Sequence, residues 1–356
     1  MVVHNSPQRP SWVRLFGVTL SVTIGFAAFA VVVAVLNDLP IRDPDGLFGP
    51  SWVRLPLIVS AMVAVDVVPR VVMAVRGGGL VREVAPRVLA QRWPMSRLAV
   101  VAAGLSSFYL AYVAYRNLKS FLPFVRQTLT DRWLVESDMW LTGGRHPGDF
   151  LHELLGTGAA AEGLSSAYIF FLFFVPFSLA LALVWSDDLA RGAWYVNALC
   201  FNWILGTASY YVLPSLGPIY VERFRFEDLP ATEVSGLQRS LLNNRVDVLA
   251  DPHATQAVHG IAAFASLHVS IVFTAALVAH LVRLPLVLRV ALWTFTALTV
   301  LATVYFGWHY LLDVVAGFGI GALSVWIGAR AIRGGAPRPA VDDRREDLQP
   351  VGAGAA

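Results

Sequence analysis

The sequence predicts an all-α fold, a polytopic membrane helical bundle of about eight transmembrane helices. Of its 356 residues, 56% are hydrophobic and only 14% are charged, and the mean hydropathy is +0.61. A soluble protein of this length would need more charge on its surface. The apolar runs reach the roughly 20 residues that a helix needs to cross a bilayer, and none alternates as the strands of a membrane barrel do.

Eight apolar stretches are expected to span the membrane. They are 12–36, 54–75, 97–115, 164–185, 192–213, 266–283, 288–307 and 309–331. The first stretch is long enough to span and lacks the small-residue cleavage site of a signal peptide, so we interpret it as a helix. An even number of spans places both termini on the same side of the membrane.

Basic residues indicate which side that is. Arginines are concentrated in the connection 76–97, in the turn 283–289 and just after the last span. These segments all lie on the side of the termini, which the positive-inside rule assigns to the cytoplasm. Nearly all basic residues are arginine, which suggests a GC-rich bacterial genome. We therefore expect a multi-pass protein of a bacterial plasma membrane with both termini cytoplasmic.

The chain divides into four expected parts. Residues 1–115 hold the first helices and a basic cytoplasmic loop, and 116–163 form an amphipathic extracytoplasmic segment. Residues 164–333 form the transmembrane core that carries the polar motifs. The Gly/Pro- and charge-rich tail, 334–356, is expected to be disordered in the cytoplasm.

Two polar motifs stand at the ends of predicted membrane helices. Ser266-Leu267-His268 opens one span, and His309 and Asp313 open another, with one helix hairpin between them. Because a single hairpin separates them, both motifs belong at the same membrane face, which this topology makes extracytoplasmic. Ionisable side chains in such segments are costly and usually functional.

The spacing of these residues indicates their chemistry. His309 and Asp313 are four residues apart, so they share one helix face, and the carboxylate can orient the imidazole as a base or nucleophile. His268 suits the role of general acid and base. Ser266 and the free N–H groups of the first helical turn would bind an anion between the histidines.

Other interpretations of the same residues remain open. Two histidines and an aspartate can ligate zinc or another metal, although Asp313 is better placed to orient His309. The same cluster could relay protons in a transporter or lipid flippase. Because Cys200 is the single cysteine, an internal disulfide and a cysteine metal site are both excluded. No cofactor fingerprint is present, so we expect neither a cofactor nor a bound metal.

The two motifs resemble the second and third signature motifs of the type 2 phosphatidic acid phosphatase superfamily. Within it, the turn sequence 211–218 and the His-Tyr-x-x-Asp form are most similar to the inositol phosphorylceramide synthase-type phosphotransferases. The resemblance implies a six-helix core and a phosphohistidine intermediate. In that mechanism His309 attacks phosphorus, Asp313 orients it, and His268 acts as acid and then base, without a metal.

The basic residues of the family pattern are not in their usual places. Thr303 stands where an arginine is expected, and no Lys-x6-Arg-Pro occurs between 190 and 265. Lys119 and Arg126 have the spacing, but two predicted helices separate them from the second motif, so coincidence is the favoured interpretation and replacement of the first motif is the alternative. An inactive scaffold of the same fold is therefore a further alternative.

The missing cations have candidate replacements in the extracytoplasmic loops. Arginine binds phosphate in a bidentate manner, and we predict that Arg245 and Arg223, in the loop before Ser266, bind the substrate. Tyr211 either lines the substrate site or simply ends its helix. The expected partners are a lipid-linked phosphate, an alcohol or water acceptor and membrane lipids. No nucleic acid is expected, and the sequence does not give the oligomeric state.

Overall fold

A computed structural model describes residues 11–332, apart from residues 44, 47–48 and 187. Over this part the chain forms thirteen α-helices, the 3-10 helix η1 and two short paired strands. The predicted all-α class is therefore confirmed. The tail that the sequence predicts over 334–356 lies outside the described residues.

The bounds of the elements follow the chain from end to end. The first half contains α1 (Trp12–Leu36), β1 (Asp45–Gly46), β2 (Gly49–Pro50), α2 (Ser51–Arg76), α3 (Val81–Arg92), α4 (Met95–Val125), α5 (Asp131–Leu141), α6 (Pro147–Leu155) and α7 (Ala159–Val184). The second half contains α8 (Leu189–Val212), α9 (Pro218–Val221), η1 (Arg223–Phe226), α10 (Glu233–Ala250), α11 (Leu267–Leu281), α12 (Leu286–Tyr305) and α13 (Leu311–Ala331).

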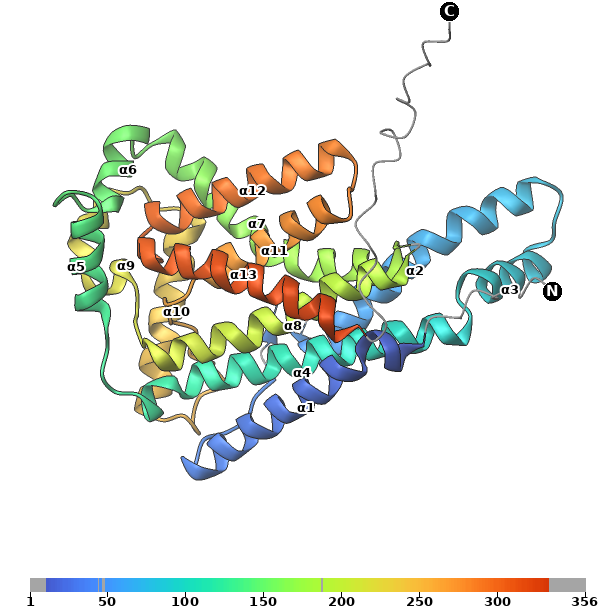
Figure 1. Cartoon of the computed structure of the whole chain (residues 1–356), viewed down its shortest axis with the longest axis horizontal. Coiled ribbons are helices and arrows are strands. Elements are labelled where there is room, and N and C mark those ends of the chain that lie inside the picture. The colour runs from blue at the N-terminus through green and yellow to red at the C-terminus, as the bar shows by residue number, and fades with distance from the viewer. Residues whose placement is uncertain (1–10, 44, 47–48, 187, 333–356) are drawn as a thin grey trace, which may run out of the picture.

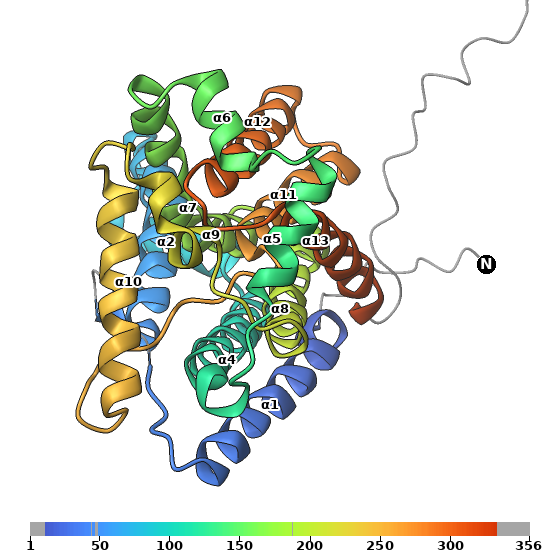
Figure 2. The same ribbon diagram turned by 90° about the vertical axis from the view of Figure 1, so that its left-hand side faces the viewer.

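The long helices lie side by side in a bundle, and shorter helices gather at its two ends (Figure 1). α5, α6, α9 and α10 lie at one end, whereas the arginine-rich α3 lies at the opposite end. Figure 2 looks onto the first end and shows α5, α6 and α10 arranged around it. The predicted extracytoplasmic segment 116–163 and the loop before Ser266 therefore meet at the end of the bundle where α11 and α13 begin.

Most of the predicted spans correspond to helices that could cross a membrane. By length and composition, six helices of the described part qualify, namely α1, α2, α4, α7, α12 and α13. α11 is also apolar but has only 15 residues. α8 has 24 residues but is not among the six.

α8 occupies the middle of the bundle, which explains why it is less apolar. It packs against α1, α4, α7, α11 and α13. Its Asn197 donates a hydrogen bond to the carbonyl oxygen of Leu15 at 2.9 Å, and Asn202 donates to the Thr274 hydroxyl at 3.0 Å. Buried amides that are hydrogen-bonded inside the protein are tolerated. A helix surrounded by protein can carry them where a lipid-facing helix cannot.

α4 extends further than the sequence predicts. The span was expected to end at residue 115, but the helix continues to Val125. The polar run that follows Tyr115 was interpreted as the start of a loop. In the structure Asn117, Lys119 and Ser120 are buried, so this run faces the interior of the bundle.

Candidate active site

His309 and Asp313 form a buried pair where α13 begins. The side chain of His309 is 5% exposed and that of Asp313 is fully buried, and Nδ1 of His309 lies 3.3 Å from Oδ2 of Asp313. The same carboxylate oxygen accepts a hydrogen bond from the backbone N–H of Tyr310 at 2.9 Å. When Nδ1 donates its proton to this carboxylate, Nε2 keeps a free lone pair and can act as a nucleophile or base.

His268 reaches the same place from the first turn of α11. Its ring centroid is 5.8 Å from that of His309, and its ring packs against Tyr168 at 4.7 Å and Phe171 at 4.5 Å. The backbone N–H of Ser266 donates to the carbonyl oxygen of Asp313 at 3.0 Å. This bond ties the start of α11 to the start of α13, so it fixes one histidine relative to the other.

Ser266 caps α11. Its hydroxyl accepts a hydrogen bond from the backbone N–H of Val269, and the residue is fully buried outside the cavity described below. Its contact with substrate therefore stays a prediction. α11 and α13 both begin next to the histidines, and helix N-termini favour negative charge. The local field thus suits an anionic group.

Both histidines line a cavity of about 500 Å³, here called the histidine cavity. Its walls come from α2, α4, α7, α8, α10, the segment 260–262 and the start of α11, and most of them are apolar or aromatic. Leu172, Phe173 and Phe177 of α7 line the cavity and are also about half exposed on the surface of the bundle. The cavity therefore extends from the histidines to a face that is expected to contact lipid.

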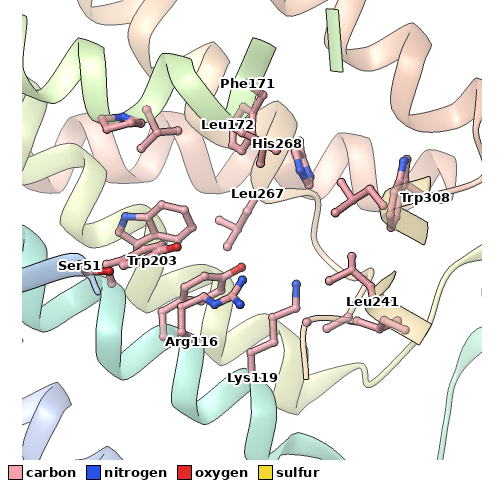
Figure 3. Close-up of a pocket in the computed structure, with 18 of the residues that line it drawn as sticks. Ser51, Arg116, Lys119, Phe171, Leu172, Trp203, Leu241, Leu267, His268 and Trp308 are labelled. Atoms are coloured by element: carbon pink, nitrogen blue, oxygen red, sulfur yellow. The ribbon is translucent and has the colours of Figure 1, made fainter. Parts of the chain in front are cut away.

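Two basic side chains from α4 enter the histidine cavity opposite His268 (Figure 3). Lys119 is 8% exposed, and its Nζ lies 4.9 Å from the ring centroid of Tyr210 and 5.8 Å from that of Tyr115. Arg116, three residues earlier, has a buried Nε without a hydrogen-bond partner among the described residues. The structure thus places two basic side chains in the same cavity as the histidines.

The sequence singles out Lys119 only through its spacing to Arg126, for which coincidence is the favoured interpretation, and nothing in the sequence analysis singles out Arg116. Arg126 is exposed and lies outside the histidine cavity, so only the lysine of that spacing reaches the histidines. Arg116 and Lys119 are three residues apart, so they share one face of an apolar helix. This spacing was the signal that could have identified them.

The predicted substrate-binding residues lie elsewhere. Arg245 lines a separate pocket, and Arg223 is exposed on η1. The hydroxyl of Tyr211 donates to the carbonyl oxygen of Leu118 at 2.7 Å, away from the histidine cavity, whereas its neighbour Tyr210 lines that cavity. None of these three predicted residues lines the cavity that holds the histidines.

Two carboxylates of α5 hold the loops of the site in place. Asp131 accepts hydrogen bonds from the backbone N–H groups of Leu216 and Gly217 and from the Tyr310 hydroxyl, each at 2.9 Å. Asp138 accepts one from the backbone N–H of Leu311, also at 2.9 Å. These bonds connect the segment before α9 with the segment that carries His309.

Asp138 holds its proton more tightly than an ordinary aspartate. Burial, together with the charges of Asp313 and Glu222, raises the pKa of Asp138 to about 7, although the bond from Leu311 opposes the shift. Near neutral pH the Asp138 carboxyl is therefore only partly ionised, which lowers its repulsion of an anionic ligand.

Gly217 shows how closely these two loops approach. Its φ is +102°, and a Cβ at this position would lie 2.5 Å from the carbonyl oxygen of Trp308. The backbone N–H of Ile219 donates to the carbonyl oxygen of Gly307 at 2.8 Å. Glycine is required here both by the left-handed conformation and by the lack of space.

The part of the chain that the structure describes contains no cluster of three or more histidine, cysteine, aspartate or glutamate side chains placed to hold a metal ion. Of the remaining histidines, His253 and His280 are exposed and lie outside the histidine cavity. His259 is 1% exposed and lines the same separate pocket as Arg245.

Comparison with known proteins gives a family assignment. The sequence model of the PAP2 superfamily matches residues 132–327, which is more than half of the chain. Neither the curated proteins nor the solved structures contain a match. The matched range includes both histidines and Asp313, but it begins after Arg116 and Lys119.

Proposed function

Because the chain belongs to the PAP2 superfamily, we propose that it is a membrane phosphatase or phosphotransferase that acts on a lipid-linked phosphate or phosphodiester. One observation supports this proposal above the others. His268, His309 and the cations of Arg116 and Lys119 line a single cavity whose remaining walls are mostly apolar. Such a cavity offers a phosphate site next to space for an acyl or prenyl chain.

The proposed first step is attack of His309 Nε2 on phosphorus. The bond from phosphorus to the leaving oxygen breaks, and His268, starting protonated, gives its proton to that oxygen. Asp313 stabilises the positive charge that develops on the His309 ring through the Nδ1 bond. Lys119 and Arg116 balance the charge on the non-bridging oxygens, as cations do in phosphoryl transfer.

The second step reverses these roles. His268, now neutral, takes a proton from water or an alcohol whose oxygen attacks phosphorus, and the bond from phosphorus to Nε2 breaks. Water gives hydrolysis and an alcohol gives transfer, so the same residues serve both outcomes. The sequence resemblance to inositol phosphorylceramide synthase-type enzymes favours an alcohol acceptor.

The lipid is proposed to enter from the side. Leu172, Phe173 and Phe177 of α7 are exposed where the histidine cavity reaches the surface of the bundle. A lipid could place its chain along this apolar wall with its phosphate at the histidines, and the burial of apolar surface would favour binding. We place this end of the bundle at the extracytoplasmic face, opposite the arginine-rich α3.

The test is turnover by the purified protein and by its His309→Ala variant, with a panel of lipid phosphates and phosphodiesters. His280→Ala serves as the matched control, because His280 is an exposed histidine at the far end of α11. We expect turnover by the wild type and by the control and none by His309→Ala. Equal turnover by all three proteins would remove His309 from the mechanism.

A further inference from the structure

A second cavity, here called the basic pocket, adjoins the histidine cavity. It has a volume of about 150 Å³, and Arg126, Arg245 and His259 supply its basic side chains. Leu216 and Ile261 line both cavities. The two cavities therefore share a wall, and a ligand in one lies next to a ligand in the other.

The basic pocket carries two positive charges. The side chain of Arg126 forms no hydrogen bond or ion pair with any described residue and is exposed at the end of α4. Nη1 of Arg245 lies 3.1 Å from Nε2 of His259. A guanidinium group can only donate, so Nε2 accepts and the imidazole is uncharged. The contact therefore orients Arg245 without changing its charge.

His259 connects this pocket to the cations of the histidine cavity. Its backbone N–H donates to the hydroxyl of Ser120 at 3.0 Å, and Ser120 follows Lys119 on α4. Burial, together with the neighbouring charges of Arg245, Lys119 and Arg116, lowers the pKa of His259 well below its ordinary value. Basic groups thus continue from the solvent-exposed end of α4 to the histidines.

No acidic side chain of the described residues forms an ion pair with either arginine. The charge of Asp131 is close enough to act on Arg245. The oxygens of Asp131, however, already accept bonds from the N–H groups of Leu216 and Gly217 and from the Tyr310 hydroxyl. Two guanidinium groups that share a small pocket without a bound carboxylate provide the donors that a phosphate group uses.

We propose that the basic pocket is a second anion-binding site, which holds a phosphate group next to the histidine cavity. Its use in the reaction rests on the proposed function above. The phosphate has two possible sources with the same chemistry. It is either inorganic phosphate leaving after hydrolysis or the phosphate of a water-soluble alcohol that accepts the phosphoryl group.

Phosphate binding to the full-length protein in lipid nanodiscs tests the site. Isothermal titration with inorganic phosphate is carried out in a Lys119→Gln background, which weakens binding in the histidine cavity. Adding Arg126→Gln or Arg245→Gln should weaken the remaining binding roughly tenfold or more, because each removes a charge-assisted hydrogen bond. Arg239→Gln is the matched control, since Arg239 is exposed on α10 and lines neither cavity.

Two further variants separate ligand binding from folding. Arg126 contacts no described side chain through a hydrogen bond or ion pair, so its replacement should leave the fold intact. Arg245→Lys retains the positive charge and should restore part of the affinity. The proposal is wrong if Lys119→Gln alone abolishes phosphate binding while Arg126→Gln and Arg245→Gln bind phosphate as the wild type does.

Kinetic measurements with Arg126→Gln distinguish the two sources. If the pocket holds the acceptor, KM should rise for glycerol 3-phosphate as acceptor and stay unchanged for glycerol. If it holds the product, both KM values should stay unchanged and inhibition by inorganic phosphate should weaken. If Arg126→Gln changes neither KM value nor the inhibition by inorganic phosphate, the assignment of the basic pocket as an anion-binding site is wrong. Phosphate binding without any lipid turnover would refute the proposed function but not the anion site.

Discussion

Lys119 is a buried lysine whose amino group contacts aromatic rings. Its Nζ lies over the rings of Tyr210 and Tyr115, and such contacts partly compensate for lost water. A buried charge nevertheless remains costly unless it is paired. An anionic phosphate in the histidine cavity would provide that pairing, which is the role that we propose for Lys119.

Replacement of Lys119 should therefore weaken substrate binding. We expect Lys119→Gln to raise KM for a lipid phosphate roughly tenfold or more, because a hydrogen bond to a charged group is lost. Lys119→Arg should retain much of the wild-type KM. Steady-state kinetics of the three proteins measure this effect. An unchanged KM in Lys119→Gln would show that the lysine does not contact the substrate.

Asp138 gives the protein a pH-dependent stability. Burial raises its pKa from the model-compound value of 3.8 to about 7. Between these two values the folded state keeps a proton that the unfolded state has lost. The corresponding stability is complete below pH 3.8 and is lost as the pH rises through about 7.

Asp138→Asn should lack this dependence because an amide does not titrate. As the pH rises from about 5 to about 8, the variant should gain stability relative to the wild type, by at most a few kcal/mol. Thermal unfolding of both proteins over this pH range measures the difference. Parallel curves of melting temperature against pH would contradict the shifted pKa.

The sequence indicated part of the site and could not indicate the rest. His268, His309 and Asp313 could be predicted because their spacing on helices determines which face they share. Arg245 and Arg223 lie in a long connection, where sequence order does not determine position. In our proposal, Lys119 and Arg116 take the phosphate-binding role that the sequence analysis predicts for Arg245 and Arg223. The direction in which the Lys119 and Arg116 side chains point depends on where α4 packs, which the sequence does not show.

At the scale of elements, the contact between α11 and α13 determines the geometry of the histidines. A Cβ at Gly317 would lie 2.6 Å from the carbonyl oxygen of Ser266, so glycine allows the two helices to meet at this point. Ser266 also donates to the backbone of Asp313. The packing of these helices therefore determines the separation of His268 and His309.

Gly317→Ala should push the two helices apart. We expect lower turnover and a loss of stability of about 1–3 kcal/mol, as is typical of overpacked sites. Gly319→Ala is the matched control, because a Cβ there meets nothing within 4 Å. Its stability should stay within about 0.5 kcal/mol of the wild type. If both variants behaved alike in turnover and unfolding, the close packing would not control the site.

Helix ends were predicted well where apolar runs stop at turns and poorly where polar residues are buried. α12 was predicted at 288–307 and spans Leu286–Tyr305. α4 was predicted to end at 115 because charged residues follow, yet Lys119 is buried and the helix continues to Val125. A polar run indicates the end of a membrane helix only when the residues face solvent.

At the scale of the whole molecule, the arrangement of helices separates two ends of different character. α5, α6, α9 and α10 surround the end with the histidines, and the arginine-rich α3 lies at the other end (Figure 1). The composition was sufficient to predict the helical membrane bundle. It could not predict the histidine cavity, because the cavity depends on how α2, α4 and α7 pack around the histidines.

The positive-inside rule predicts that α3 lies in the cytoplasm and α5 on the opposite side. Single cysteines introduced by Arg132→Cys on α5 and Arg82→Cys on α3 can test this in intact cells with a membrane-impermeant maleimide. Both positions are exposed, whereas the native Cys200 is fully buried and should not react. We expect labelling at 132 only. Labelling at 82 but not at 132 would reverse the topology.

The central claim is that His309 carries the phosphoryl group during the reaction. The most direct test is a reaction with radiolabelled lipid phosphate, quenched at alkaline pH because phosphohistidine is labile in acid, followed by mapping of the labelled peptide. We expect label on His309 in the wild type and no labelled protein in His309→Ala. A labelled intermediate that persists in His309→Ala would contradict it.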